Sequence, residues 1–175
     1  LLSKIVDALD NLYVDMAKSI ETDTKGDVYE SLLSKLATAG VNGQFRTPRH
    51  IIKMMVELLD PKPDDIICDP ACGTSGFLVA AGEYLKDKYK DEIFYNREKK
   101  DHYNNHMFYG YDMDRTMLRV VAMNMMTHGV DNPNIDYRDS LSDQNVDTGK
   151  YSIILANPPF KGSLDYDIVS TDLLK

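Results

Sequence analysis

Four consecutive residues near the end of the chain carry groups suited to chemistry on an amino nitrogen. They are Asn157-Pro158-Pro159-Phe160, and they follow a largely apolar run at residues 151–156. Because proline disfavours helix in the residue before it and lacks an N–H, the local carbonyls point outward without a competing donor. The Asn157 side-chain oxygen and the Pro158 carbonyl can accept both hydrogens of an exocyclic NH2 group, and Phe160 offers a ring for stacking a planar base. These residues indicate chemistry on a nucleobase or amide nitrogen; taken alone, they also suit a plain polar turn.

A second candidate site is the segment from Asp69 to Leu78, which follows a short apolar run and leads into a predicted helix. Gly73 and Gly76 let the backbone turn sharply and approach a ligand closely. The helix N-terminus offers N–H groups to a carboxylate or phosphate, and Asp69 can take an ammonium group. The segment is not a dinucleotide-binding fingerprint, because Ala71 replaces the first glycine, nor is it a P-loop. It predicts a ligand with both an ammonium and a carboxylate, and the alternative is an ordinary strand–helix turn.

Three further aspartates follow predicted strands. Asp112 ends the second strand, where a carboxylate can accept hydrogen bonds from ribose hydroxyls. Asp114 is predicted to cap the next helix. Asp139 follows the third strand and can accept from an adenine amino group, or it is a loop or cap residue. The Asp- and Asn-rich loop at 131–143 lacks calcium-loop spacing and is interpreted as a solvated turn.

These side chains require a scaffold that brings strand ends together. Short apolar runs and helical periodicity alternate along the chain, which is typical of a parallel, doubly wound α/β sheet. The polar stretch at 90–105 is interpreted as a surface insertion. The methionine-rich face of the helix at 114–128 (Met117, Met123 and Met126) is interpreted as core. The predicted strands are 66–68, 108–111, 135–137 and 151–156, and the predicted helices are 2–20, 27–38, 47–59 with Thr47 as N-cap and Pro48 as first residue, 76–89 and 114–128.

Composition bounds the class of protein. The chain has 175 residues and a formal net charge of −8, which argues against a stand-alone nucleic-acid binder with its usual basic surface. No apolar run is long enough to span a membrane, and the four histidines show no zinc spacing. Cys68 and Cys72 are predicted to be free thiols, which suits a reducing, cytoplasmic setting. Without an initiator Met, and with Lys175 soon after a strand, the chain is interpreted as a fragment.

Taken in order, the motifs resemble those of DNA amino-methyltransferases that use S-adenosylmethionine, in the adenine-N6 class. More closely, Gln44-Phe45-Arg46-Thr47-Pro48-Arg49 and the segment 69–78 resemble the modification (M) subunit of type I restriction–modification systems. The resemblance covers about residues 40–165. It implies a Rossmann-like S-adenosylmethionine-dependent methyltransferase sheet with an N-terminal helical flank. Residues 1–42 would end a helical domain, and residues 43–175 would form the N-terminal part of the catalytic domain.

By this resemblance, the cofactor is S-adenosylmethionine, the catalytic residues are Asn157, Pro158, Pro159 and Phe160, and no metal is involved. Asp112 would hold the ribose, where many relatives have Glu, and Ser75 stands where many have Gly or Ala. The candidate cofactor-site residues are Gln44, Phe45, Arg46, Thr47, Pro48, Arg49, Asp69, Ala71, Gly73, Thr74, Ser75, Gly76, Asp112, Asp139 and Asn157.

The implied reaction is methylation of adenine N6 in double-stranded DNA, with the target adenine flipped out of the duplex. The implied partners are a specificity (S) subunit, which would choose the DNA sequence, and a restriction (R) subunit; the setting is cytoplasmic. Two alternatives stay open. The same groups suit methylation of another planar amino group, such as cytosine N4, guanine N2 in RNA or a glutamine side chain. The chain also suits a non-catalytic assembly module.

Overall fold

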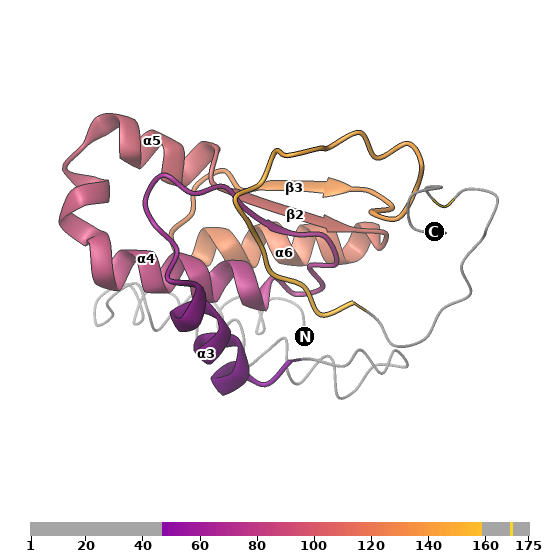
Figure 1. The fold of residues 1–175 in the computed structure, drawn as a ribbon, viewed down its shortest axis with the longest axis horizontal. Helices are drawn as coiled ribbons and strands as arrows, with labels where there is room; N and C mark the ends of the chain where they lie inside the picture. The colour runs from indigo at the N-terminus through magenta and orange to yellow at the C-terminus, as the bar shows by residue number, and fades with distance from the viewer. Residues whose placement is uncertain (1–46, 159–168, 170–175) are drawn as a thin grey trace, which may run out of the picture.

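The structure, a computed structural model, describes residues 47–158 and residue 169 (Figure 1). The helices predicted at 2–20 and 27–38 lie outside these residues. Within them, the predicted strands and helices follow in the predicted order, and one further helix stands before the second strand. The strands are β1 (Ile67–Asp69), β2 (Phe108–Asp112), β3 (Asn134–Tyr137) and β4 (Ile153–Ile154), and the helices are α3 (Arg49–Leu59), α4 (Gly76–Phe94), α5 (Arg97–Asn105) and α6 (Arg115–Thr127).

The four strands form one parallel sheet in the order β3-β2-β1-β4, which confirms the predicted sheet. Asp69 of β1 pairs with Gly110 of β2, and Cys68 pairs with Ile154 on the other side. The chain runs outward from β1 through β2 to β3 and then returns to place β4 on the opposite side of β1. Ligands of such sheets bind at this reversal, outside the carboxyl ends of the strands.

The core lies between the sheet and helices α4 and α6, which lie along one face of it in Figure 1. Ile67, Leu78, Phe108 and Met125 are fully or almost fully buried there. Contact is closest at Gly110 in β2, where an added Cβ would lie 2.8 Å from the Ile135 side chain. A side chain at this strand position would therefore force the ends of the neighbouring side chains to shift.

The interpretation of residues 90–105 as a surface insertion was wrong. Helix α4 continues through a kink at Tyr89 (φ −126°, ψ 24°) to Phe94, and α5 follows, with Asn96 capping its first amides. Tyr103 is fully buried, with its ring edge-on to Phe94 at 5.5 Å and to Phe108 at 5.2 Å. The many charged residues of this stretch occupy the exposed face, while a few apolar residues anchor it to the core.

The predicted core role of the methionine-rich face was also wrong for two of its three members. Met123 and Met126 are 53% and 57% exposed, whereas Val121 and Met125 of the same helix are fully buried. Residues four apart share a helix face, and residues two apart lie about 200° apart around the axis. Val121 and Met125 therefore face the sheet, and Met123 faces away from it.

Helix α3 begins at Arg49, one residue later than the predicted first helical residue Pro48. Pro48 occupies the N-cap position, and its carbonyl accepts from the Ile51 and Ile52 amides, while no side chain caps the helix. The prediction that Thr47 is the N-cap was therefore wrong. The helix ends at Leu59, as predicted, and Asp60 follows it in the left-handed conformation.

Other bounds differ by small amounts. Strand β4 is shorter than the predicted run at 151–156, and β1 begins one residue later than predicted. None of the helices in the described part of the chain is long and apolar enough to cross a membrane.

We expect Tyr103→Ala to lower the free energy of unfolding by about 3–5 kcal/mol, because it removes a buried aromatic side chain and leaves a cavity. Tyr95→Ala is the matched control, since Tyr95 is 87% exposed and its loss should change stability by less than about 0.5 kcal/mol. Urea unfolding followed by circular dichroism measures both. Equal effects of the two substitutions would mean that residues 90–105 are a surface insertion after all.

Candidate functional site

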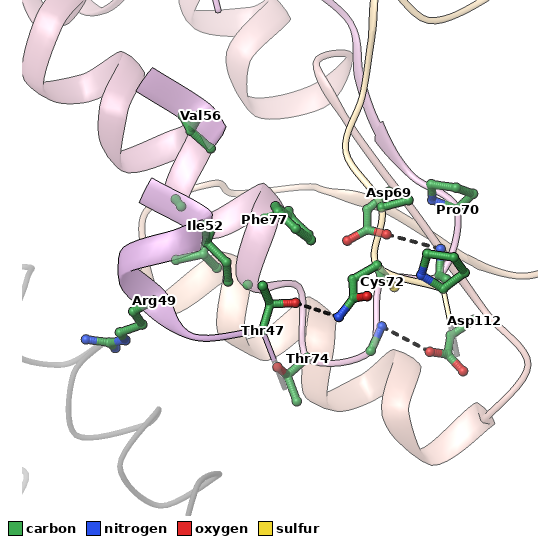
Figure 2. Close-up of a pocket in the computed structure, with 18 of the residues that line it drawn as sticks. Thr47, Arg49, Ile52, Val56, Asp69, Pro70, Cys72, Thr74, Phe77 and Asp112 are labelled. Carbon is green, nitrogen blue, oxygen red and sulfur yellow. Dashed lines mark hydrogen bonds between the residues drawn. The ribbon is translucent and has the colours of Figure 1, made fainter. Parts of the chain in front are cut away.

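A cavity of about 1390 Å³ opens at the carboxyl edge of the sheet (Figure 2). In Figure 2, Asp69 and Asp112 lie on one side of it, and Ile52 and Val56 of α3 lie on the other. Roughly 300–1,000 Å³ is usual for a small-molecule site, so there is room here for more than one small ligand. The predicted site residues that line it are Thr47, Arg49, Asp69, Ala71, Gly73, Thr74, Gly76, Asp112, Asp139, Asn157 and Pro158.

Seven predicted site residues do not belong to this lining or lie outside the described residues. Pro48 caps α3, and Ser75 is fully buried at the start of α4. Pro159 and Phe160 lie outside the described residues, as do the other three predicted residues, which are Gln44, Phe45 and Arg46.

The glycine-bearing loop between β1 and α4 turns through two left-handed residues, Gly73 (φ 50°) and Ser75 (φ 64°). Left-handed backbone is unusual for serine and marks a loop whose surroundings fix its conformation. The Ser75 amide donates to the Cys72 carbonyl at 2.6 Å, and its hydroxyl donates to the Thr74 carbonyl at 2.6 Å. No side chain caps the first turn of α4. Among the described residues, the N-terminus of this helix therefore borders the cavity without a side-chain cap.

Asp112 ties this loop to the end of β2. One carboxylate oxygen accepts from the Gly73 amide at 3.1 Å, and the other accepts from the Asp114 amide at 2.8 Å. Asp114 in turn accepts from the Thr116 and Met117 amides and caps α6, which confirms its predicted role. A carboxylate has about four acceptor positions, so Asp112 can still accept from a ligand in the cavity.

Asp69 is a buried carboxyl group at the end of β1. It is 2% exposed and accepts from the Ala71 amide at 3.1 Å. Burial raises the pKa of Asp69 to about 7, the Ala71 hydrogen bond opposes this shift, and the negative charge of Asp112 adds to it. A carboxyl held in this state gains most from a cation placed beside it. The geometry therefore favours a ligand whose positive end enters this side of the cavity.

Asp139 reaches the cavity from the loop after β3. Its carboxylate accepts from the Leu141 amide at 3.0 Å, and the neighbouring Ser140 hydroxyl donates to the Pro70 carbonyl at 2.6 Å. The adjacent Arg138, which also lines the cavity, donates to Asp147 at 2.5 Å, and its guanidinium carbon lies 4.0 Å from the centre of the Tyr111 ring. The loop is thus attached both to the β1 loop and to β2, so it is more than the solvated turn that was predicted.

Asn157 and Pro158 follow β4 and line the same cavity. The Asn157 side-chain amide donates to the Thr47 hydroxyl at 2.8 Å, across 110 residues of sequence; the dashed line at Thr47 in Figure 2 marks this bond. Two of the three sequence motifs therefore meet directly, and the third, the glycine-bearing loop, lines the same cavity.

Asn124 is a residue that the motifs did not reveal. It is fully buried in α6, and its side-chain nitrogen donates to the Thr74 carbonyl at 2.8 Å. Its side-chain oxygen has no hydrogen-bond partner within the described part of the chain. The sequence carried one signal of this role, which is a polar amide side chain next to the buried residues Val121 and Met125 of the same helix. The hydrogen bond holds the glycine-bearing loop against α6.

Other chemistry is limited among the described residues. Cys68 and Cys72 are free and buried, and burial raises the pKa of Cys68 to about 12, so its thiol stays protonated at neutral pH. No group of three or more His, Cys, Asp or Glu side chains in residues 47–158 is arranged to hold a metal ion.

Comparison with known proteins identifies close sequence relatives. The model of the N-6 DNA methylase family matches residues 20–173. The type I restriction enzyme EcoEI methylase subunit of Escherichia coli is 34% identical over 93% of this chain and 32% of its own length. The StySJI methylase subunit of Salmonella typhimurium is 33% identical over 97% of this chain and 33% of its own length. The chain thus spans about a third of these relatives.

Solved structures share the fold. The crystal structure of the EcoKI M protein, from a type I restriction enzyme, superposes with a TM-score of 0.66 at 28% identity, covering 75% of this chain and 28% of that one. A chain from a structural study of assembly and conformational transition in a type I R-M system superposes with a TM-score of 0.70 at 32% identity. That match covers 88% of this chain and 33% of the other.

We expect Asn124→Ala to lower the free energy of unfolding by about 0.5–1.5 kcal/mol, because it removes one of the two donors to the Thr74 carbonyl and leaves only the Ser75 hydroxyl. Amide hydrogen exchange at Ser75 should become faster, since the loop loses its support from α6. Asn132→Ala is the control, because it removes an exposed amide-to-amide bond to Asn105 and should cost less than about 0.5 kcal/mol. Unchanged exchange at Ser75 in the Asn124 variant would contradict the anchoring role.

Proposed function

The chain belongs to the N-6 DNA methylase family, and we propose that it forms the cofactor-binding part of an enzyme that methylates N6 of adenine in DNA from S-adenosylmethionine. One observation carries this proposal. The acidic ends of β1 and β2, the glycine-bearing loop and Asn157 all line a single cavity. A cofactor that has an ammonium group, a carboxylate, a ribose and an adenine matches that set of groups.

The described residues suit this cofactor. The buried Asp69 carboxyl would take the ammonium group, which compensates its costly burial. The uncapped N-terminus of α4 would favour the carboxylate. Asp112 would accept from the ribose hydroxyls, and Asp139 would accept from the adenine amino group. S-adenosylmethionine supplies a methyl group that is already activated by its sulfonium, so the protein does not need to generate a strong nucleophile.

The protein must instead orient the amino group that receives the methyl. The lone pair of adenine N6 is delocalised into the ring. When the Asn157 side-chain oxygen and the Pro158 carbonyl accept both N–H hydrogens, the nitrogen is favoured in a tetrahedral form with its lone pair free. Positioning of this kind and acceptors matched to developing charge can each lower a barrier by several kcal/mol. We infer that Pro159 and Phe160 complete this site, with Phe160 stacking on a flipped base.

Further parts of the protein belong to the same proposal. Residues 1–42 would end an N-terminal helical domain, and residues 43–175 would begin the catalytic domain. A specificity subunit would choose the DNA sequence and supply positive charge, which suits the net charge of −8. A restriction subunit is a further expected partner, and the cytoplasm is the expected compartment.

We expect Asn157→Ala to abolish methyl transfer, because it removes one of two acceptors for the N6 hydrogens. S-adenosylmethionine should still bind, since the carboxylates and the loop stay in place. Methylation of adenine in DNA by the complete subunit with its specificity partner measures the first effect, and calorimetry measures the second. Asn105→Ala, which changes an exposed side chain bonded to Asp101, is the control. An Asn157 variant that methylates normally would exclude this role of Asn157. Methyl groups found on cytosine, RNA or glutamine would show that the enzyme acts on a substrate other than adenine in DNA.

The affinity for S-adenosylmethionine should depend on pH through Asp69. With its pKa raised to about 7, the free carboxyl is largely protonated below that pH, whereas the ammonium group binds the ionised form. Binding therefore releases a proton, and the dissociation constant should rise by up to about tenfold per unit as pH falls from about 7 to 5.5. Asp69→Asn should bind more weakly with a flat profile over this range. A wild-type dissociation constant that stays constant would remove Asp69 from the ammonium site.

A further inference from the structure

The hydroxyl of Thr47 accepts a hydrogen bond from the Asn157 side-chain amide at 2.8 Å. Resting on the proposed function, we propose that Thr47 is a positioning residue that holds the Asn157 side chain in place for methyl transfer. Thr47 would thereby act on the acceptor amino group, in addition to lining the cavity.

The chemistry of an asparagine amide makes its placement important. Its oxygen end accepts and its nitrogen end donates, yet the two ends are almost equal in size. Rotation by about 180° therefore keeps the shape and reverses the hydrogen-bonding character. An exocyclic NH2 group presents only donors to the site, so it requires the oxygen end of Asn157. A hydroxyl can accept from the nitrogen end or donate to the oxygen end, so its role is to hold the side chain in place. In the structure Thr47 accepts from the nitrogen end, which leaves the oxygen end for the substrate.

Thr47 is well placed because its hydroxyl does not cap helix α3. The residue precedes α3, whose N-cap position belongs to Pro48 and whose first turn has no side-chain cap. The fixed φ of Pro48 and its carbonyl bonds to the Ile51 and Ile52 amides restrict the backbone that carries Thr47. The hydroxyl is therefore available to Asn157.

Helix α3 is itself firmly attached, so the Thr47 hydroxyl has a rigid base. Ile52 and Val56 are 6% and 1% exposed and belong to the core. At the far end, Asp60 accepts from Tyr84 at 2.6 Å and from Lys88 at 2.7 Å, both on α4. Asn157 is constrained from its own side by Pro158, which limits its backbone to extended conformations. The bond thus joins two restrained segments and transmits the placement of α3 to the end of β4.

Thr47→Val tests this role, because valine keeps the branched shape and removes the acceptor. In the complete modification complex at saturating S-adenosylmethionine, kcat should fall on the order of 10- to 100-fold. The dissociation constant for S-adenosylmethionine should change by less than about twofold, since no charged contact is lost. Thr47→Ser keeps the hydroxyl and should restore most of kcat. A kcat equal to wild type, with only the cofactor dissociation constant raised, would overturn the proposal and leave Thr47 as a cofactor contact.

Crystal structures of the complete wild-type, Thr47→Val and Thr47→Ser subunits give a readout that needs no catalysis. We expect the Asn157 side chain to turn away from position 47 in the valine variant and to keep its place in the serine variant. An unmoved Asn157 in the valine variant would also overturn the positioning role. If Asn157 turns away but the wild-type complex methylates no adenine, the contact stands and the proposed reaction fails.

Discussion

The site depends on the position of β1 between β2 and β4. Because all three strands are parallel, their carboxyl ends meet at one edge, and the groups that follow them lie within reach of one another. Asp69, Asp112 and Asn157 are far apart in sequence and become neighbours through this pairing alone. Gly110 packs closely against Ile135 and Cys72, which lets β2 lie close to these neighbouring segments. A shift of β2 by one residue would move Asp112 off the edge and remove its bond to Gly73.

Electrostatics then decide what the cavity can bind. Asp69, Asp112 and Asp139 line one cavity, and such a set is unfavourable unless donors or cations compensate it. The protein supplies some of these donors as backbone amides, from Ala71 to Asp69, from Gly73 to Asp112 and from Leu141 to Asp139. The raised pKa of Asp69 indicates that this compensation is incomplete at the deepest carboxyl group. The missing charge is what the ammonium group of the proposed cofactor would provide.

The sequence alone predicted the parts of this arrangement that local rules determine. Residues after short apolar runs were expected at strand ends, and Asp69, Asp112, Asp139 and Asn157 indeed line one cavity. The roles of these residues remain predictions, and Phe160 lies outside the described residues. Tertiary packing was beyond reach of the same rules. The polar run at 90–105 hides Tyr103 among charged residues, and helical phase, rather than residue type, decides that Met125 is buried and Met123 exposed.

Asn124 and Thr47 mark the limit of local rules more sharply. An asparagine within a helix is locally unfavourable. The role of Asn124 becomes clear only from the tertiary structure, in which it donates to the Thr74 carbonyl. A threonine before a proline and a helix satisfies the rule for an N-cap, yet here the hydroxyl bonds to Asn157 and the helix begins without a side-chain cap. A cap typically contributes about 1 kcal/mol, so the helix forgoes a stabilising contact that its own sequence could make. Departures of this kind are expected where a residue serves a functional site rather than the stability of its own helix. Thr47 lines the cavity, and Asn124 bonds to the loop that lines it.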